Sequence, residues 1–480
     1  MGNIMDYLDW RGDITFEQSP FNEVDNVILA QLAYVNFRDI IPSPEEKRSI
    51  TLKEASQMFF DMYTENELSE AKKILKDNNQ DFILEMLEKI DGTVKENLIH
   101  QVLNLDFEQL ARLFEETKEK PEILDKKIEH IKYVDKNKLS DEQEEKYNSL
   151  GEDVIKNGNY AVVTMAGGQG TRLGHSGPKG TYDIGLDSHK SLFELLSDGL
   201  KEAGKKYDVT IPWFIMTSRE NNEETVNFFE KNRYFGYQKD KNIFFFIQGE
   251  LPMVDTEGKI LIGEDGLIKQ AADGHGGIYE SLVKSGMTEK MRQLGVEWVF
   301  IGGVDNCLVK MVDPVLMGVA IDKGVTVACK SIVKANPHEK VGVFCKRNGK
   351  PGVIEYSEIT DEMAEATDEN GELLYGESHI LCNLFSIDAV ERMGQTPLPY
   401  HSAFKKAKYI DKDGNLVVPD SPNAYKFEAF LFDAFGEVDD MAILRVKREE
   451  EFAPVKNADS AGVDCPSTAR KLYEEFHHLK

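Results

Sequence analysis

From Tyr160 onward, short apolar runs alternate with segments of helical periodicity. The apolar runs read YAVVTMA, PWFIMTS, NIFFFIQ, EWVFIGGVD and VTVACKS, and the helical segments between them include SLFELLSDGLKEAGKKY and NNEETVNFFEKN. This alternation predicts an α/β fold, a doubly wound and mostly parallel sheet with helices on both faces. Because the runs are apolar without alternation, we expect their strands to be buried on both sides.

The chain has 480 residues, which is too long for one ordinary hydrophobic core. Residues from Leu68 to about Lys120 have helical patterns with charged faces, and the stretch after about Asp411 is irregular. We therefore expect four parts. They are an accessory module at 1–66, a helical N-terminal domain at 67–158, the sheet domain at 159–410 and a C-terminal segment at 411–480.

The formal net charge of −28 argues against a nucleic-acid partner, because phosphate backbones would be repelled. It does not argue against a small phosphorylated ligand that a few local cations hold. No apolar run reaches membrane-spanning length, and the N-terminus lacks a basic and apolar leader. The five cysteines have no metal-ligand spacing and are expected to be reduced, so we expect a soluble cytoplasmic protein without a membrane partner.

The stretch VVTMAGGQGTRLGHSGPKG places a glycine-rich loop directly after the first apolar run. At the carboxyl end of a parallel strand, exposed backbone N–H groups can cradle phosphate oxygens. The spacing does not match the dinucleotide fingerprint, the P-loop or the nucleophile elbow. What remains is a loop with two cations, Arg172 and Lys179, which suits phosphoryl or nucleotidyl transfer. The plainer alternative is a glycine-rich turn with surface cations.

Taken with later segments, this loop resembles the signature of the UDP-sugar pyrophosphorylases, a family of sugar-1-phosphate nucleotidyltransferases. The resemblance is greatest to the eukaryotic-type UDP-N-acetylglucosamine pyrophosphorylases and covers roughly residues 68–470. Its further motifs occur in order as PWFIMTS, IQGELP, DGHGGIY, VDNCLVK, VGVFCK, IEYSEI, YKFEAFLFDAF and EEEFAPVKNADS. It implies a Rossmann-like fold of the nucleotide-diphospho-sugar transferase type, in which 159–410 is catalytic and 411–480 completes the sugar and phosphate site.

On the nucleotide side, the resemblance implies that the glycine loop and Arg172 hold the phosphates of UTP. The loop residues concerned are Gly167, Gly168, Gln169 and Gly170. Lys179 would act on the phosphate that is attacked or leaves, and Gln248 and Gly274 would read the edge of the uracil base.

On the phosphate side, the resemblance implies that Asp305 holds Mg²⁺ against the α-phosphate, while Lys456 reaches the sugar phosphate. Taken alone, an aspartate at the end of a parallel strand is as readily a turn or helix-cap residue as a magnesium ligand. Lys456, taken alone, would be interpreted as a surface lysine.

On the sugar side, the resemblance implies that Glu355 and Asn383 bind hydroxyl groups and that Phe430 and Phe432 form a wall beside an N-acetyl group. The spacing of the two phenylalanines equally suits one core-facing side of a strand. His275 stands where the N-acetylglucosamine enzymes usually carry asparagine and where glucose-type members carry histidine; a packed turn histidine is nearly as plausible. The segment ESHILCNLFSI also differs from the usual family pattern.

The implied reaction joins UTP and a sugar-1-phosphate into a UDP-sugar and releases pyrophosphate. N-acetylglucosamine-1-phosphate is the expected substrate, and glucose-1-phosphate or galactose-1-phosphate is the alternative. A non-catalytic UDP-sugar sensor is a competing hypothesis from another functional class. Family members usually continue into a small C-terminal β-rich domain, which we expect to be reduced or absent. Residues 1–66 lie outside the match, and we expect them to form a module that docks a protein partner or has a regulatory role.

Overall fold

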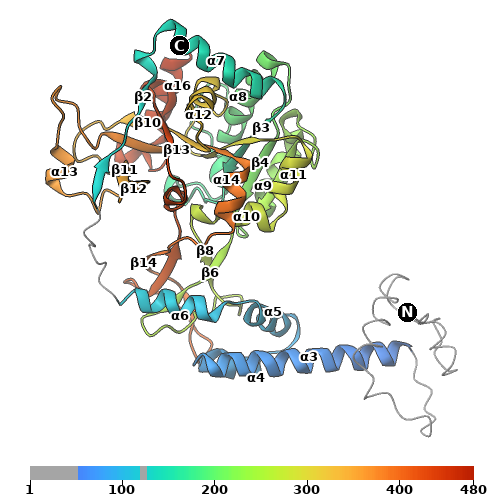
Figure 1. Cartoon of the computed structure of the whole chain (residues 1–480). Coiled ribbons are helices and arrows are strands. Elements are labelled where there is room, and N and C mark those ends of the chain that lie inside the picture. The colour runs from blue at the N-terminus through green and yellow to red at the C-terminus, as the bar shows by residue number, and fades with distance from the viewer. Residues whose placement is uncertain (1–51, 119–126, 480) are drawn as a thin grey trace. The chain divides into compact units, whose positions relative to one another are not determined.

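The computed structural model describes residues 52–118 and 127–479, which form two compact units (Figure 1). The first unit contains the described residues up to Phe114 together with Pro252–Lys269 and Lys405–Ala424. The second contains Glu115–Leu251, Gln270–Phe404 and Tyr425–Lys480. Most of the predicted accessory module at 1–66 lies outside the described residues, and the predicted domain boundaries stay predictions.

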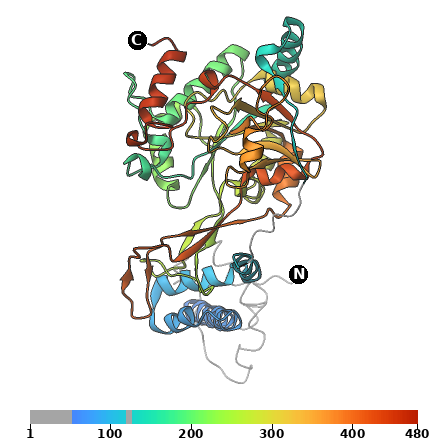
Figure 2. The same cartoon turned by 90° about the vertical axis from the view of Figure 1, so that its left-hand side faces the viewer.

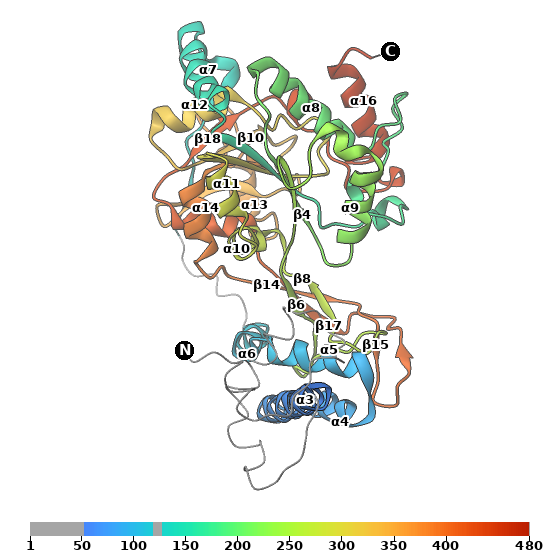
Figure 3. The same cartoon turned by 90° about the vertical axis from the view of Figure 1, so that its right-hand side faces the viewer.

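The first unit is built on helices, as its charged and apolar periodicity predicts. They are α3 (Leu52–Asp77), α4 (Asp81–Lys89), α5 (Gly92–Leu103) and α6 (Phe107–Glu116). Two buried or half-buried glutamines join these helices to segment 252–269. Oε1 of Gln80 accepts from Ile260 N at 2.9 Å, and Oε1 of Gln101 accepts from Ile268 N at 2.8 Å. Figures 2 and 3 show segment 405–424 beside the same helices.

The second unit is organised around one large mixed sheet. Its strand order is β2 (Val134–Asp135), β18 (Ala442–Arg445), β10 (Val327–Val333), β13 (Glu377–Ser386), β9 (Trp298–Gly303), β3 (Tyr160–Met165), β4 (Trp213–Thr217) and β5 (Ile243–Ile247). Strands β9, β3, β4 and β5 are mutually parallel, as are β2, β18 and β10. Strand β13 runs antiparallel to both of its neighbours. The expected mostly parallel sheet is therefore confirmed.

Helices cover both faces of this sheet because successive strand residues are apolar on both sides. In β3, Tyr160 and Val162 pack into one core while Ala161 and Val163 pack into the other. The first core is covered by α7 (Asp141–Lys156), α8 (Leu192–Tyr207), α9 (Asn222–Lys231), α12 (Pro314–Lys323) and α16 (Pro466–Phe476). The second is covered by α10 (Ile278–Lys284), α11 (Met287–Gln293) and α14 (Ile387–Gly394), as Figure 3 shows.

The remaining described elements are short. They are β1 (Ile128–His130), β6 (Glu250–Pro252), β7 (Val254–Asp255), β8 (Gln270–Ala272), β11 (Val343–Arg347), β12 (Lys350–Ile354), β14 (His401–Lys405), β15 (Tyr409–Ile410), β16 (Leu416–Val417), β17 (Ala424–Glu428), α13 (Asp361–Glu365) and α15 (Arg448–Glu451). Across 52–118 and 127–479, no helix combines the length and apolar character that crossing a lipid bilayer requires.

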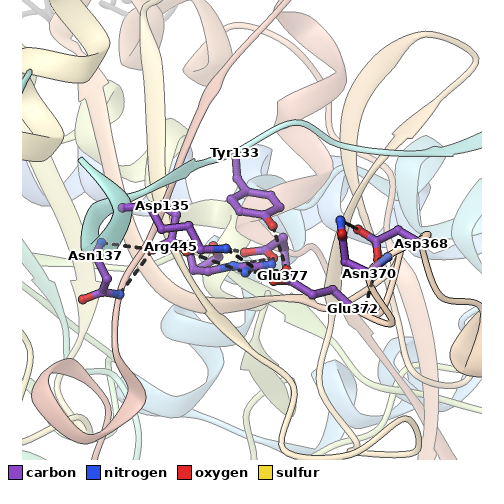
Figure 4. A network of polar contacts seen from close by, with 10 residues as sticks. Tyr133, Asp135, Asn137, Asp368, Asn370, Glu372, Glu377 and Arg445 are labelled. Carbon is purple, nitrogen blue, oxygen red and sulfur yellow. Dashed lines mark hydrogen bonds and ion pairs between the residues drawn. The ribbon is translucent and has the colours of Figure 1, made fainter. Parts of the chain in front are cut away.

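Arg445, on β18, is the centre of a network of polar contacts that joins distant segments (Figure 4). Its Nε donates to Glu377 at 2.9 Å, its Nη1 pairs with Glu372 at 2.9 Å, and its guanidinium lies 3.8 Å from the centre of the Tyr133 ring. The hydrogen bond from Arg445, with a second from Tyr133, lowers the pKa of Glu372 to about 2. The network therefore connects β13, β18 and the residue before β2.

Candidate active site

All of the predicted site residues lie in the second unit, where the parallel strands β3, β4, β5 and β9 end at the same edge of the sheet. The glycine loop after β3 folds back on itself. Gly170 N donates to Gly177 O at 2.9 Å, and Lys179 N donates to Gly168 O at 3.0 Å. Lys179 therefore lies at the base of the loop. Arg172 lies in the turn, with an exposed side chain.

Gly167 and Gln248 come together although they follow different strands, β3 and β5. A Cβ atom on Gly167 would lie 2.5 Å from Oε1 of Gln248, so a side chain larger than glycine's would displace the amide. Gln248 is 9% exposed, and its backbone N–H donates to Thr217 O at 2.8 Å. Nearby in the loop, Oε1 of Gln169 is a buried acceptor without a hydrogen-bond partner among the described residues. Two of the residues expected at the nucleotide are thus in contact.

Lys179, Asp305 and Lys456 form a charged cluster from three distant parts of the chain. Nζ of Lys179 lies 2.9 Å from Oδ2 of Asp305, which follows β9. Burial alone would raise the pKa of Asp305, but the positive charges of Lys179 and Lys456 outweigh it and hold that pKa below its ordinary value. Asp305 and Lys456 also line one small cavity of about 90 Å³. The site therefore holds an ionised carboxylate that pairs with Lys179 and is also influenced by the charge of Lys456.

Asn306 explains how Lys456 reaches this cluster. Its Nδ2 donates to Glu451 O at 2.8 Å, and its Oδ1 accepts from Ala453 N at 2.9 Å. One residue before it, Asp305 O accepts from Val455 N at 2.8 Å. These bonds fix the segment before Lys456 along the end of β9. Sequence reasoning did not assign Asn306 a role, although the motif VDNCLVK contained it.

The donor set at Asp305 fits a magnesium ion that arrives with a nucleotide. Within the described part of the chain, no group of three His, Cys, Asp or Glu side chains gathers to hold a metal ion. Mg²⁺ commonly keeps several waters and takes one or two protein carboxylates plus phosphate oxygens as its other ligands. A single ionised carboxylate beside two lysines that could neutralise phosphate charge meets that requirement.

The turn after β8, which carries Gly274 from the predicted nucleotide site and His275 from the predicted sugar site, is bonded to the segment that carries the two predicted phenylalanines. Gly274 has a φ of +88°, and a Cβ there would lie 2.3 Å from Ala429 O, so this approach requires glycine. Nδ1 of His275 accepts from Leu431 N at 3.0 Å. The His275 ring lies 5.5 Å from the ring of Phe430 and 6.1 Å from that of Phe432. The structure therefore brings these predicted sugar residues together.

Glu355 is half-buried and follows β12. Burial, with the nearby charge of Glu358, raises its pKa above the ordinary value. The charges of His401 and Asp433 also act on it, and the His401 ring stacks on Phe430 at 4.6 Å. Its backbone N–H donates to Glu358 at 2.9 Å. A half-buried carboxyl is suited to accepting hydrogen bonds from hydroxyl groups.

Asn383 differs from the other predicted sugar residues because it is fully buried. Its Nδ2 donates to Ile301 O at 3.2 Å, and its Oδ1 lies 2.9 Å from Nε2 of His379. His379, which sequence reasoning did not single out, lines the cavity that Asp305 and Lys456 share. The departure of ESHILCNLFSI from the family pattern was the only sequence signal for it.

Asp273, before the same turn, is a buried carboxyl that sequence reasoning also did not single out. It is 4% exposed, and its Oδ1 has no hydrogen-bond partner in the described structure. Burial raises its pKa from 3.8 to about 7, and Glu280 adds to the shift. Between these two values the folded chain holds a proton that the unfolded chain has lost. The contribution of Asp273 to folding stability therefore falls as the pH rises from about 4 to about 7 and is constant above.

We accordingly expect Asp273→Asn to gain stability over the unmodified chain as the pH rises through this range, by up to ~4 kcal/mol. The measurement is the free energy of unfolding from denaturant titrations, followed by the fluorescence of Trp213 and Trp298, at several pH values. The matched control for the substitution itself is Asp187→Asn, at an exposed aspartate. Parallel pH profiles for Asp273→Asn and the unmodified chain would contradict the prediction.

Comparisons with known proteins agree with this geometry. The family model described as UTP–glucose-1-phosphate uridylyltransferase matches residues 104–468. UDP-N-acetylglucosamine diphosphorylase 2 of Arabidopsis thaliana is 36% identical over 427 residues, which are 84% of this chain and 82% of that protein. UDP-N-acetylglucosamine pyrophosphorylase of Saccharomyces cerevisiae is 41% identical over 341 residues, 69% of this chain and 71% of that protein.

Among solved structures, the uridine diphosphate N-acetylglucosamine pyrophosphorylase of Trypanosoma brucei, crystallised with an inhibitor, is similar over most of this chain. It has a TM-score of 0.71 and 32% sequence identity, and the match covers 85% of this chain and 84% of that one. The likeness therefore extends from sequence motifs to the arrangement of the sheet.

Proposed function

Because the chain belongs to the UTP–glucose-1-phosphate uridylyltransferase family, we propose that it joins UTP and N-acetylglucosamine-1-phosphate into UDP-N-acetylglucosamine and pyrophosphate. The enzyme is a UTP-dependent sugar-1-phosphate uridylyltransferase. The observation that carries the proposal is the cluster of Lys179, Asp305 and Lys456 at one edge of the sheet. The choice of sugar is supported by relatives at 36% and 41% identity that are named for N-acetylglucosamine.

The nucleotide would lie along the glycine loop, with its base near Gln248 and Gly274. A glutamine amide offers one acceptor and two donor hydrogens, which suits the mixed edge of uracil. The contact between Gly167 and Gln248 supports this position, because it lets backbone and amide approach the same ligand closely. Arg172 would hold the departing pyrophosphate with its planar fork of donors.

The chemistry requires charge neutralisation more than proton transfer. The attacking oxygen of a sugar-1-phosphate is already an anion near neutral pH, so no general base is needed. The obstacle is the repulsion between two polyanions in a protein whose own net charge is −28. Lys179 would bind the α-phosphate and Lys456 the sugar phosphate, so that attack on the α-phosphorus is aligned with departure of pyrophosphate.

Asp305 would hold Mg²⁺ when the nucleotide is bound. The bound ion would supply Lewis-acid neutralisation of phosphate charge. Support comes from the ionised state of Asp305, whose pKa the two lysines lower despite burial. Lys179 contacts the same carboxylate and can share its charge with phosphate oxygens.

The sugar would lie against Phe430 and Phe432, with Glu355 accepting from its hydroxyl groups. The two rings lie 5.2 Å apart and form one apolar surface suited to an N-acetyl methyl group. A second candidate substrate is glucose-1-phosphate or galactose-1-phosphate. It is favoured by His275, which packs against both rings where the N-acetylglucosamine enzymes usually carry asparagine.

Pyrophosphate release from UTP, measured over a panel of sugar-1-phosphates with and without Mg²⁺, tests the proposal. We expect the highest kcat/KM with N-acetylglucosamine-1-phosphate and loss of turnover when EDTA removes the metal. A higher kcat/KM with glucose-1-phosphate would transfer the assignment to the second candidate. Tight UDP-sugar binding without turnover on any sugar would contradict both and identify a sensor.

We further propose that 159–410 is the catalytic domain, that 411–480 completes its sugar and phosphate site, and that 1–66 docks a protein partner. The contact of the segment before Lys456 with the end of β9 supports the second point. A cytoplasmic location is supported by the cysteines, which are all buried and free.

A further inference from the structure

Strand β13 carries a bulge at the edge of the candidate site. Cys329 and Ser331 on β10 are two residues apart, yet their partners on β13, Asn383 and His379, are four residues apart. Within the extra residues, Leu381 has a φ of 56°, a left-handed backbone that favours glycine. Bulges and such backbone conformations occur preferentially beside functional sites.

The bulge makes a contact possible that a regular strand forbids. Residues four apart in a regular strand are separated by about 13 Å. Here Nε2 of His379 lies 2.9 Å from Oδ1 of Asn383. That oxygen also accepts from Sγ of Cys329 at 3.1 Å, and Nδ2 of Asn383 donates to Ile301 O at 3.2 Å. With its oxygen and one amide hydrogen used inside a fully buried site, Asn383 is poorly placed to bind substrate itself.

This arrangement fixes the tautomer of His379. Because Oδ1 of Asn383 is an acceptor, Nε2 of His379 must donate and carries the ring proton. Nδ1 is left with a lone pair and has no hydrogen-bond partner in the described part of the chain. The ring is held edge-on against three aromatic rings, at 5.1 Å from Phe344, 5.6 Å from Phe432 and 5.8 Å from Phe435. Burial lowers its pKa to about 4, which keeps it neutral.

His379 is close both to the charged cluster that contains Asp305 and Lys456 and to Phe432. It shares the cavity of about 90 Å³ with Asp305 and Lys456, and its ring contacts Phe432. His275 also lies beside Phe432, and its Nδ1 accepts from Leu431 N, so its Nε2 carries the proton. One neutral histidine therefore offers a lone pair and the other an N–H. A lone pair repels phosphate oxygens but accepts from a hydroxyl or an amide N–H.

We propose that His379 accepts, through Nδ1, a hydrogen bond from a hydroxyl or amide N–H group of the sugar, and that Asn383 is the positioning residue that sets its tautomer. The inference rests on the proposed function and refines it, because Asn383 then acts through His379 and not on the sugar. Both departures from the family pattern, His275 and ESHILCNLFSI, would thereby contribute to the choice of sugar.

His379→Phe tests the inference by kinetics, because it keeps an aromatic ring and removes the lone pair. We expect kcat/KM for the preferred sugar-1-phosphate to fall about tenfold while KM for UTP is unchanged. Among glucose-1-phosphates that each lack one hydroxyl, the loss should vanish for the analogue lacking the hydroxyl that His379 binds. The control is His338→Phe, whose side chain is 56% exposed and outside the site. Unchanged kcat/KM, or an equal loss for every analogue, would overturn the inference.

Histidine ¹⁵N NMR of the unmodified full chain gives a second readout that needs no turnover. We expect His379 to be neutral with its proton on Nε2, and its Nδ1 resonance to move upfield when UDP-N-acetylglucosamine binds. In Asn383→Leu, the proton should distribute over both nitrogens. A proton on Nδ1, or an unmoved resonance in the saturated complex, would overturn the inference. Absence of turnover with every sugar would instead contradict the proposed function. The NMR measurement would still test the role of His379.

Discussion

Arg172→Ala is expected to lower kcat by about 10²–10³-fold while weakening UDP-sugar binding by less than about fivefold. The side chain is exposed at the turn of the glycine loop, within the short helix Thr171–Leu173. At this exposed position the guanidinium of Arg172 contributes little to the stability of the folded chain. On our account it stabilises charge on the departing pyrophosphate, which UDP-sugar lacks. The measurements are steady-state pyrophosphate release and calorimetric titration with UDP-sugar.

The control for Arg172→Ala is Arg392→Ala, which removes an exposed arginine from α14, outside the site. Both variants should retain the unfolding midpoint of the unmodified chain. Arg172→Lys keeps the charge without the planar guanidinium group, so its kcat should lie between that of Arg172→Ala and that of the unmodified chain. Equal losses of kcat and of UDP-sugar affinity in Arg172→Ala would contradict a role confined to the departing group.

Asp305→Asn is expected to lower kcat by a similar factor, about 10²–10³, and to raise the Mg²⁺ concentration needed for half-maximal rate. The substitution removes the charge that pairs with Lys179 at 2.9 Å and also lowers the charge facing Lys456. It therefore affects metal binding and the placement of both cations. A titration of the rate with Mg²⁺ at saturating UTP measures both effects.

Asp305→Glu separates the loss of charge from a loss of folding, because it keeps the carboxylate and moves it by one methylene. We expect it to fold like the unmodified chain and still to lose most of its kcat, since the position of the carboxylate matters. Asp187→Asn, at an exposed aspartate, should change neither quantity. An unchanged Mg²⁺ dependence in both Asp305 variants would exclude this carboxylate as the ligand.

The sequence predicts those strands of the sheet whose residues are apolar on both faces. The runs at β3, β4, β5, β9 and β10 all form strands that are buried over most of their length, because burial stabilises such apolar residues. Strand β13 was not predicted, since Glu377, His379 and Asn383 make it look too polar for a sheet centre. Several of its polar groups bond to partners far along the chain, such as Arg445 for Glu377 and Ile301 for Asn383. No local pattern carries that information.

In the candidate site, too, some positions follow from local sequence and others depend on contacts between distant segments. The glycine loop and Asp305 could be predicted because a parallel strand places the loop that follows it at the ligand edge. Lys456 could be predicted only through the resemblance, because its place depends on the hydrogen bonds of Asn306 to Glu451 and Ala453. The contact between Asn383 and His379 is the least predictable, since it depends on a bulge of two residues in β13.

The central claim is that these charged groups gather to join a uridylyl group to a sugar phosphate. ³¹P NMR of the purified full chain with UTP, N-acetylglucosamine-1-phosphate and Mg²⁺ tests it most directly. We predict that signals of a UDP-sugar and of inorganic pyrophosphate grow together in equal amounts as both substrates decline. Growth of inorganic phosphate alone, or no new signal from enzyme that binds UDP-sugar, would contradict the claim.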